Sequence, residues 1–346
     1  MFMKMKIRIE KELAAYAQSI DKLYSLKKLS PVLSKSIKEF ICRPGKRVRP
    51  VLFCIGYLGF SRKTPPGLYR SALSLELLHD FLLVHDDIVD KSDTRRGAPS
   101  MHAMLNRYLY PGKKIRFDGE DLAIVIGDVM YAMGLEAFLS VKEDLRRKEA
   151  ALRKLISAAL YTGSGEFIEL LLGTKPIEKV TQEDIYKVYD YKTANYTFAS
   201  PLTMGSTLAG TGAGQTEKLF SYGMFLGRAF QIRDDIIGTF GDEKITGKSS
   251  LTDIKEAKRT LLIWHAFNHA GKKDRLVIKR IMGSESFGNS ELLKMRGIIV
   301  QSGALAYAQG QIKYLFSKAR TQLNALKMNA SYKQTLDNFS QKILKT

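Results

Sequence analysis

Apolar residues recur at helical spacing over long parts of this chain, and this pattern restricts the possible folds more than any other feature. It is clearest in three segments, residues 69–90, 122–160 and 219–237. Apolar positions three or four apart place side chains on one face of an α-helix, whereas runs that alternate as in a strand are scarce. The sequence therefore predicts an all-α bundle of roughly ten helices.

The breaks between these segments are short and rich in turn residues, as in the stretches "CRPGKR" and "AGTGAGQTEK". None is long enough, or biased enough in composition, to be a linker between domains. The 346 residues are 45% hydrophobic, which is sufficient for a large buried core. We expect residues 1–346 to form a single domain.

The chain is strongly basic. Its 55 Lys and Arg residues exceed its 35 Asp and Glu residues, which gives a formal net charge of +20. A small anion, a nucleic acid or an anionic membrane surface are the partners that such a charge favours. The basic residues are scattered and form no recognisable nucleic-acid motif, so we expect no specific nucleic-acid binding.

The two cysteines and the N-terminal segment indicate the compartment. Cys42 and Cys54 form no CxxC pair, and we interpret them as ordinary buried thiols of a reducing compartment. The first 18 residues are basic but lack the apolar run of a signal peptide, and no later stretch approaches the length and apolarity of a membrane span. We therefore expect a cytoplasmic protein without a transmembrane segment.

Residues 77–97 contain several carboxylates at the end of an apolar helical segment. At ~100° per residue, Asp86 and Asp90 lie one turn apart beside the apolar stripe, and Asp87 lies further round. Like charges at this spacing weaken a helix by a few tenths of a kcal/mol per pair, so we expect a cation to stabilise them. The stripe that we expect to face the core contains Leu78, Phe81, Leu82, His85, Ile88 and Val89.

A second aspartate pair, Asp234 and Asp235, ends another apolar helical segment, and Gln231 lies one turn earlier on the same face. The next ligand position of the first motif is occupied here by Gly238, and Asp242 is a possible contributor further along. Two acidic rims of this kind can face one another across a cavity in the centre of a helical bundle.

Carboxylates without an accompanying Cys or His cluster suit Mg²⁺, which retains several waters and bridges carboxylates to substrate phosphates. The metal ligands expected are Asp86, Asp87, Asp90, Asp234 and Asp235, whereas His79 and His85 are expected to orient or pack. Each basic element nearby is, by itself, an ordinary surface charge. Together with two acidic sites they describe a cage for a diphosphate. These elements are Lys46, Arg47, Arg49, Arg95, Arg96, Lys192 with Thr193, Lys248 and Lys258.

The ordered set of motifs resembles the trans-isoprenyl diphosphate synthases of the polyprenyl synthetase family, which includes farnesyl and geranylgeranyl diphosphate synthases. The resemblance extends from "GKRVRP" to "KEAKRTLL". The family's motifs match this chain at Gly45, Lys46 and Arg49, at His79, at Asp86, Asp87 and Asp90, at Arg95, Arg96 and Gly97, at Lys192 and Thr193, and at Gln231, Asp234 and Asp235.

The resemblance implies the isoprenoid synthase bundle, a homodimer, and head-to-tail condensation of an allylic diphosphate with isopentenyl diphosphate, with several Mg²⁺ ions. The allylic substrates implied are dimethylallyl, geranyl and farnesyl diphosphate. By resemblance, the five aspartates and Lys192 are catalytic, and Thr193 and Gln231 bind substrate. The metal-free diphosphate of isopentenyl diphosphate is assigned to Lys46, Arg49, His79 and Arg96, and the allylic diphosphate to Arg95, Lys192, Lys248 and Lys258.

The residues before the first motif bear on product length. Phe81 is five residues before Asp86, about 7.5 Å deeper along an ideal helix. In the family, a bulky aromatic there with an uninterrupted first motif resembles geranylgeranyl diphosphate synthases of the archaeal type, with farnesyl diphosphate as the alternative product. Leu82 and Leu78 are the other candidates for the floor, because they are offset from Asp86 by only ~40° and ~80°, against ~140° for Phe81.

Other functions are compatible with part of this pattern. A terpene cyclase shares the first motif and the fold, but its second site usually has an Asn/Ser/Glu form, unlike the aspartate pair here. A non-catalytic partner subunit of a heteromeric synthase usually lacks one aspartate motif, and both are present in this chain.

Overall fold

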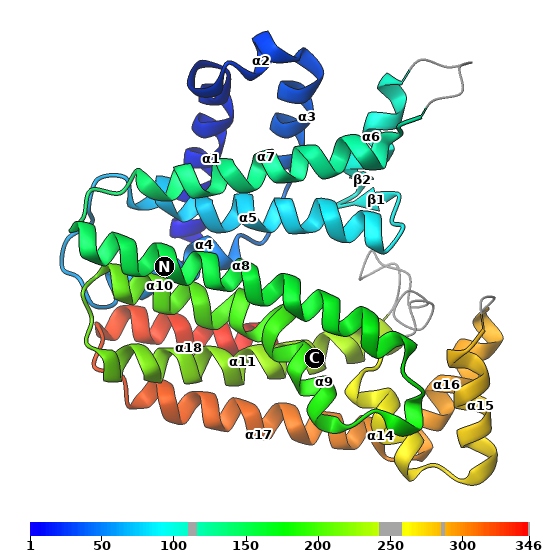
Figure 1. Cartoon of the computed structure of the whole chain (residues 1–346). Coiled ribbons are helices and arrows are strands. Elements are labelled where there is room, and N and C mark those ends of the chain that lie inside the picture. The colour runs from blue at the N-terminus through cyan, green and yellow to red at the C-terminus, as the bar shows by residue number, and fades with distance from the viewer. Residues whose placement is uncertain (110–115, 242–257, 285–287, 345–346) are drawn as a thin grey trace. The chain divides into compact units, whose positions relative to one another are not determined.

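The computed structural model describes residues 1–109, 116–241, 258–284 and 288–344. These residues form helices joined by short turns, with one small β-hairpin (Figure 1). The chain divides into two compact units. Unit 1 contains Met1–Leu155 and Met204–Thr211, and unit 2 contains Ile156–Thr203 and Gly212–Thr346.

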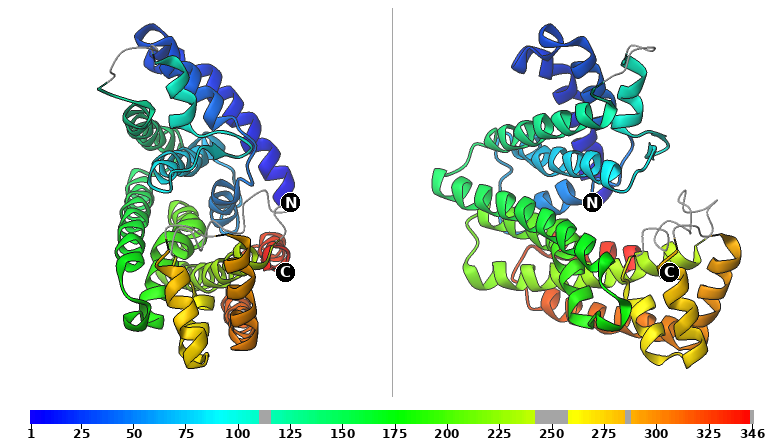
Figure 2. Two further views of the ribbon diagram at one scale, coloured as in Figure 1. Left: turned by 90° about the vertical axis from the view of Figure 1, so that its right-hand side faces the viewer. Right: turned by 45° about the vertical axis from the view of Figure 1, so that its right-hand side comes forward.

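Unit 1 is built around two long antiparallel helices, α5 and α7, which lie side by side in all views (Figures 1 and 2). Its elements are α1 (Phe2–Tyr24), α2 (Leu26–Leu29), α3 (Pro31–Ile41), α4 (Val48–Leu58), α5 (Leu68–Val89), β1 (Thr94–Arg95), β2 (Ala98–Pro99), α6 (Met101–Leu105), η1 (Asn106–Tyr108), α7 (Gly119–Leu139) and the first part of α8 (Leu145–Thr174). The end of α10 (Ser200–Leu208) also belongs to it.

Unit 2 is organised around α11, which packs against α17 and η3. Its further elements are η2 (Ile177–Lys179), α9 (Gln182–Val188), η3 (Tyr189–Ala199), α11 (Ala213–Phe240), α14 (Leu261–His269), α15 (Lys272–Met282), α16 (Asn289–Gln301), α17 (Ala304–Asn324) and α18 (Ala330–Leu344). A continuous apolar core links α11 with α14–α17.

The all-α prediction is confirmed, but it underestimated the number of helices and missed the hairpin. One-turn helices such as α2 and α6 are too short to show a periodic pattern in the sequence. The β1–β2 hairpin has only two residues in each strand, which is too short for an alternating pattern. The single-domain organisation remains a prediction beside the two compact units.

A glycine of α7 leaves room for a side chain of α5. A Cβ atom on Gly127 would lie 2.6 Å from Nε2 of His85, so the ring could not keep this position beside a larger residue. The His85 ring occupies this space, with Nε2 3.2 Å from the carbonyl oxygen of Ile124. His85 thus packs between the helices, as expected.

The face of α5 that enters the core differs in part from the expected one, since Leu78 is the one residue of the expected stripe that is buried. Val84, Asp80 and Asp87 are completely buried, whereas Val89 is 43% exposed and Phe81, Leu82, His85 and Ile88 are half-buried. The expected face was chosen by placing apolar side chains in the core and charged side chains outside it. Arginines pair with the buried carboxylates, which allows acidic residues to occupy core positions.

Two further expectations were wrong. Cys54 is buried, but Cys42 is exposed at the C-terminus of α3. In addition, α7 and α8 each contain an 18-residue window that is apolar enough to cross a membrane by length and composition, with mean hydropathies of 1.8 and 1.3 for those windows. Core helices of soluble proteins often meet the same criterion.

Candidate functional site

The first aspartate motif lies at the C-terminal end of α5, and an arginine from the hairpin neutralises it. Asp90 is the C-cap of the helix, Asp86 is half-buried and Asp87 is completely buried. Arg95 donates from Nε to Oδ1 of Asp87 at 2.6 Å and from Nη2 to the same oxygen, and Nη2 lies 3.6 Å from Oδ2 of Asp86. Arg95 is therefore a cation of the kind expected from the sequence to stabilise these carboxylates. Burial raises the pKa of Asp87, and the hydrogen bond from Arg95 opposes that rise.

The hairpin fixes the position of both arginines. Arg96 and Gly97 form its two-residue turn, with φ values of 56° and 75°, as expected for a tight turn between antiparallel strands. Gly97 adopts this conformation without strain, but a non-glycine residue such as Arg96 is rarely found in it. Arg95 therefore points to Asp87, and Arg96 reaches the buried acids of α5.

Three predicted ligands of the metal-free diphosphate influence one another in unit 1. His79, on α5, lies in the electrostatic field of Arg49 and Arg96, and its pKa is held well below the usual value, first by burial and then by these two arginines. His79 is therefore neutral at physiological pH and can donate or accept a hydrogen bond. The fourth predicted ligand, Lys46, is exposed in the turn before α4.

Sequence reasoning missed a buried ion-pair network beside these residues. The Arg47 side chain is completely buried and pairs with Glu10 and Glu76. Glu76 and Asp80, one turn apart on α5, both contact Arg96. The available signal was the occurrence of two acids four residues apart in an otherwise apolar segment.

The second aspartate motif, on α11, is tied to η3 by a chain of hydrogen bonds. Thr193 donates to Oε1 of Gln231 at 2.6 Å, and Nε2 of Gln231 donates to Oδ1 of Asp235 at 2.9 Å. The hydroxyl of Tyr189 donates to Oδ2 of the same carboxylate. Asp235 is therefore buried and held at both oxygens, whereas the side chain of Asp234 is 44% exposed.

This arrangement requires η3 to lie against α11. A Cβ atom on Gly227 of α11 would lie 2.3 Å from Cα of Ala194, so glycine permits the contact. The η3 segment is a π-helix. This form is rare in proteins, and where it occurs it often lies at a functional site. It carries both Lys192 and Thr193.

Lys192 lies between two carboxylates of α8. Its Nζ is 2.6 Å from Oε2 of Glu166 and also pairs with Glu169. Neither glutamate was predicted as a site residue, and Tyr189 was also missed. The only sequence signal for the glutamates was their spacing of three on a helix.

Three residues that were predicted to contribute to the site lie at the edge of a described segment or outside the described residues. Lys248 and Asp242 lie outside the described residues. Lys258 is half-buried at the beginning of the described segment 258–284.

The candidates for the floor of the product channel differ in environment. Phe81 is half-buried and packs edge-on against His85, with a ring separation of 4.7 Å, and against Tyr131 of α7 at 5.3 Å. Leu78 is buried, with 2% exposure, and Leu82 is half-buried. Tyr131 was not predicted, since its contact with Phe81 depends on the pairing of α5 with α7.

The donor groups at both motifs fit Mg²⁺. The accessible groups are carboxylate oxygens, the ligands that this ion prefers. No compact group of three or more His, Cys, Asp or Glu side chains occurs among the described residues.

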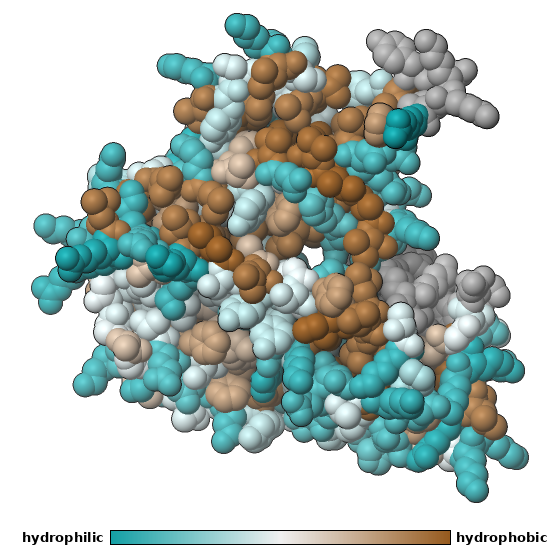
Figure 3. All heavy atoms as spheres, in the orientation of Figure 1, coloured by the Kyte–Doolittle hydropathy of each residue, from teal (hydrophilic) through white to brown (hydrophobic). Residues whose placement is uncertain are grey.

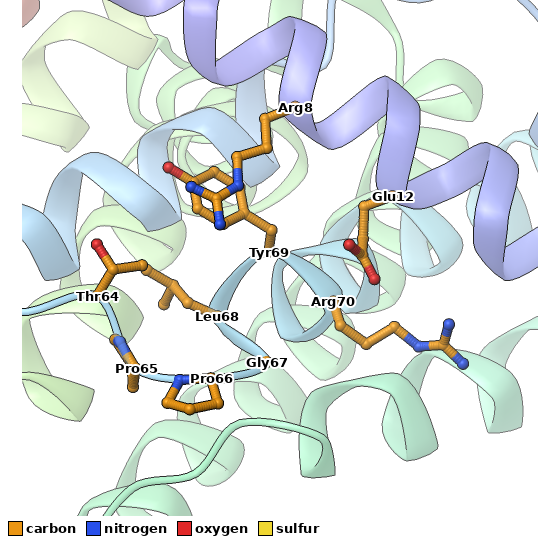
Figure 4. Close-up of a pocket in the computed structure, with 9 residues that line it drawn as sticks. All are labelled: Arg8, Glu12, Thr64, Pro65, Pro66, Gly67, Leu68, Tyr69 and Arg70. Atoms are coloured by element: carbon orange, nitrogen blue, oxygen red, sulfur yellow. The ribbon is translucent and has the colours of Figure 1, made fainter.

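A separate pocket of ≈ 290 Å³ in unit 1 contains none of these residues (Figure 4). It lies at the N-terminal end of α5, where Arg8 covers the ring of Tyr69 at 3.9 Å. The aspartate motif is at the opposite end of the same helix.

Comparisons with known proteins agree with the motifs. The family model described as polyprenyl synthetase matches residues 30–298. A geranylfarnesyl diphosphate synthase from Aeropyrum pernix is 31% identical, over 83% of this chain and 86% of that protein. A geranylgeranyl diphosphate synthase from Saccharolobus solfataricus is 30% identical, over 76% and 75% of the two chains.

Solved structures show the same fold. A geranylgeranyl pyrophosphate synthase from Corynebacterium glutamicum, solved with isoprenyl diphosphate and magnesium, matches with a TM-score of 0.89 and 25% identity, covering 99% of this chain and 98% of that chain. The synthetase from Pyrococcus horikoshii matches with a TM-score of 0.82 and 26% identity, covering 100% and 99%. With its motifs, its fold and a family match over most of its length, the chain belongs to the polyprenyl synthetase family.

Proposed function

We propose that this protein is a short-chain trans-prenyltransferase that condenses an allylic diphosphate with isopentenyl diphosphate and releases geranylgeranyl diphosphate. The observation that carries this proposal is the presence of both aspartate motifs, each joined to its own basic or hydrogen-bonding partners. Relatives named geranylgeranyl diphosphate synthase support the substrate class.

The aspartates divide into two groups by accessibility. Asp86, Asp90 and Asp234 are the more accessible, and we propose them as direct ligands of Mg²⁺. Asp87 and Asp235, also predicted as ligands, are held by Arg95 and by Tyr189 with Gln231, and they orient the site. Bound Mg²⁺ would neutralise the charge that develops on the departing diphosphate.

The protein's basic residues bind the two diphosphates in different ways. Lys192, Arg95 and Lys258, with Lys248, hold the allylic diphosphate, and Thr193 and Gln231 orient the network beside it. Glu166 and Glu169 keep the Nζ of Lys192 in place until substrate arrives. Arg49, Arg96, Lys46 and the neutral His79 bind the diphosphate of isopentenyl diphosphate.

The reaction balances without a protein base. The allylic C–O bond breaks and its electron pair leaves with the diphosphate. The double bond of isopentenyl diphosphate then forms the new C–C bond, and loss of a proton to the departed diphosphate creates the new double bond. Charged groups preorganised around the leaving group stabilise this transition state.

We also propose a homodimer, supported by an apolar stripe on the exposed side of α7 (Figure 3). Leu122 and Val125 are 39% and 60% exposed. Contiguous apolar surface of this kind marks association sites. Asp128 and Glu136 lie on the same exposed side, which is unfavourable for a lipid-facing helix. We propose a cytoplasmic location on the basis of the family resemblance.

One experiment tests the function. Purified protein is incubated with Mg²⁺, labelled isopentenyl diphosphate and, in turn, dimethylallyl, geranyl or farnesyl diphosphate, and the products are separated by length. We expect a C20 product. A C15 product would favour a farnesyl diphosphate synthase, a C25 product would match the Aeropyrum pernix relative, and no incorporation from any primer would favour a non-catalytic subunit.

A further inference from the structure

Asp80 is a buried carboxylate that the reaction described above does not use. Its side chain is completely inaccessible, and within the described part of the chain neither of its oxygens accepts a hydrogen bond. Removing a carboxylate from water without hydrogen-bond donors is unfavourable. An apolar residue at this position of α5 would avoid that cost, so packing alone does not explain an aspartate.

The carboxyl group of Asp80 faces Arg96. Nη1 of Arg96 lies 3.3 Å from Oδ1 of Asp80, and Nη2 lies 3.4 Å from Oε1 of Glu76. The two acids are one helical turn apart, so they bind two different nitrogens of one guanidinium group. A planar group held at two points has its orientation fixed as well as its position.

The two acids have different additional partners. Glu76 also pairs with the buried Arg47, which is itself bound to Glu10. Arg47 and Arg43 act on Asp80 electrostatically, without an ion pair among those observed in unit 1. Burial, followed by repulsion from Glu76, raises its pKa well above the usual value, and Arg96, followed by Arg47 and Arg43, opposes the rise. Among the ion pairs observed in unit 1, Glu76 therefore pairs with both Arg47 and Arg96, whereas Asp80 pairs with Arg96 alone.

Arg96 needs such support. Its φ of 56° places a non-glycine residue in the left-handed region at the tip of a two-residue turn. Contacts elsewhere must compensate for a strained backbone of this kind. The side chain is only 15% exposed, so its guanidinium is held against α5 and does not extend freely into solvent.

We propose that Asp80 is a positioning residue which, together with Glu76, fixes the guanidinium of Arg96 to receive the metal-free diphosphate of isopentenyl diphosphate. This inference rests on the proposed function, which assigns Arg96 to that substrate. Asp80 itself touches neither substrate and acts through Arg96.

The primary test is Asp80→Asn, which keeps the shape of the side chain and replaces its acidic group with an uncharged amide. We expect the KM for isopentenyl diphosphate to rise roughly tenfold, with kcat and the KM for the allylic primer changed less than about twofold. Calorimetric binding of isopentenyl diphosphate without Mg²⁺ should weaken by a similar factor. A purely structural role would affect both substrates and the thermal midpoint together.

A double-variant cycle shows whether Asp80 acts through Arg96. In an Arg96→Ala background, Asp80→Asn should change the KM for isopentenyl diphosphate by less than about twofold, because the group that it positions is absent. Asp93→Asn is the matched control. Asp93 lies in the same segment, its side chain is 90% exposed, and we expect no change in either KM.

Arg96→Lys provides an independent test if substitutions of the buried Asp80 prevent folding. A lysine keeps the positive charge but cannot bind both carboxylates through a planar fork, so the KM for isopentenyl diphosphate should again rise. Wild-type affinity in Arg96→Lys, or in a folded Asp80→Asn, would overturn the inference. If Arg96→Ala itself left the KM for isopentenyl diphosphate unchanged, the assignment of Arg96 in the proposed function would be wrong instead.

Discussion

Asp86 and Asp87 are neighbours in sequence but lie in different environments. Asp86 is half-buried, whereas Asp87 is fully enclosed and bound by Arg95. The second motif repeats this division, with Asp234 accessible and Asp235 held at both oxygens. In each motif one carboxylate can therefore bind a cation, while its neighbour fixes the local structure.

We predict that Asp86→Ala and Asp235→Ala each reduce kcat on the order of 10²-fold or more, because each removes part of the charge arrangement that stabilises the transition state. Steady-state rates at several Mg²⁺ concentrations, together with circular dichroism, provide the measurement. Asp93→Ala, in an exposed position of the same segment as Asp86, is the control. Near wild-type turnover in either variant, with Mg²⁺ still required, would show that the metal site is elsewhere.

Arg49 tests the separation of the two diphosphate subsites. We predict that Arg49→Ala raises the KM for isopentenyl diphosphate more than that for the allylic primer, since a charged hydrogen-bonded contact contributes roughly 1.5 to 3 kcal/mol. The measurement is the KM of each substrate with the other saturating. An equal effect on both would contradict the assignment of separate subsites.

At the scale of the helices, the sequence indicates the charged residues of the candidate site but not the elements against which they pack. Asp86, Asp87 and Arg95 could be found because acids followed by paired arginines interrupt an apolar segment. Asp80 and Tyr189 could not be assigned, because their roles depend on contacts with Arg96 and Asp235, which come from other elements. Helical periodicity gives the faces of a helix, but not the neighbours against which they pack.

The π-helix η3 links the second motif to the beginning of α14. The hydroxyl of Tyr189 donates to Asp235 and accepts from the backbone N–H of Leu261 at 2.9 Å. We predict that Tyr189→Phe raises the Mg²⁺ concentration for half-maximal rate roughly tenfold, because Asp235 loses one of the donors that orient it. Titration with Mg²⁺, and binding of Mn²⁺ followed by electron paramagnetic resonance, test this directly.

Tyr186→Phe is a suitable control for that variant. Tyr186 lies one turn earlier, with its ring 6.0 Å from that of Tyr189, and its hydroxyl bonds to Gln311 instead of an aspartate. We expect its Mg²⁺ dependence to match the wild type. An unchanged curve for Tyr189→Phe would mean that Gln231 suffices to orient Asp235.

The pairing of α5 with α7 bears on product length. Phe81 is half-buried against Tyr131, so its ring is a candidate floor for the growing chain. We predict that Phe81→Ala shifts the products beyond C20, as measured by chromatography of the dephosphorylated alcohols, whereas Phe117→Ala, at an exposed position before α7, leaves them unchanged. If a folded and active Phe81→Ala gives the wild-type distribution, Leu82 and Leu78 become the candidates.

At the scale of the whole molecule, the exposed apolar side of α7 is either buried by a partner or left in contact with water. A monomer with this stripe would expose Leu122 and Val125 to water, and burying such surface drives association. The same helix is apolar enough to cross a membrane by composition, so the two explanations make opposite predictions. A dimer requires no lipid, whereas a membrane segment requires lipid or detergent.

We predict that the wild-type protein is a dimer at micromolar concentration in detergent-free buffer and that Val125→Lys converts it to a monomer. A lysine in the centre of an apolar interface would be buried without a partner, which opposes association. Sedimentation equilibrium measures the change, and Leu293→Lys, at a 65% exposed position on α16, is the matched control that should remain dimeric. A wild-type monomer that co-sediments with phospholipid vesicles would show that this stripe of α7 contacts lipid and not a second copy of the chain.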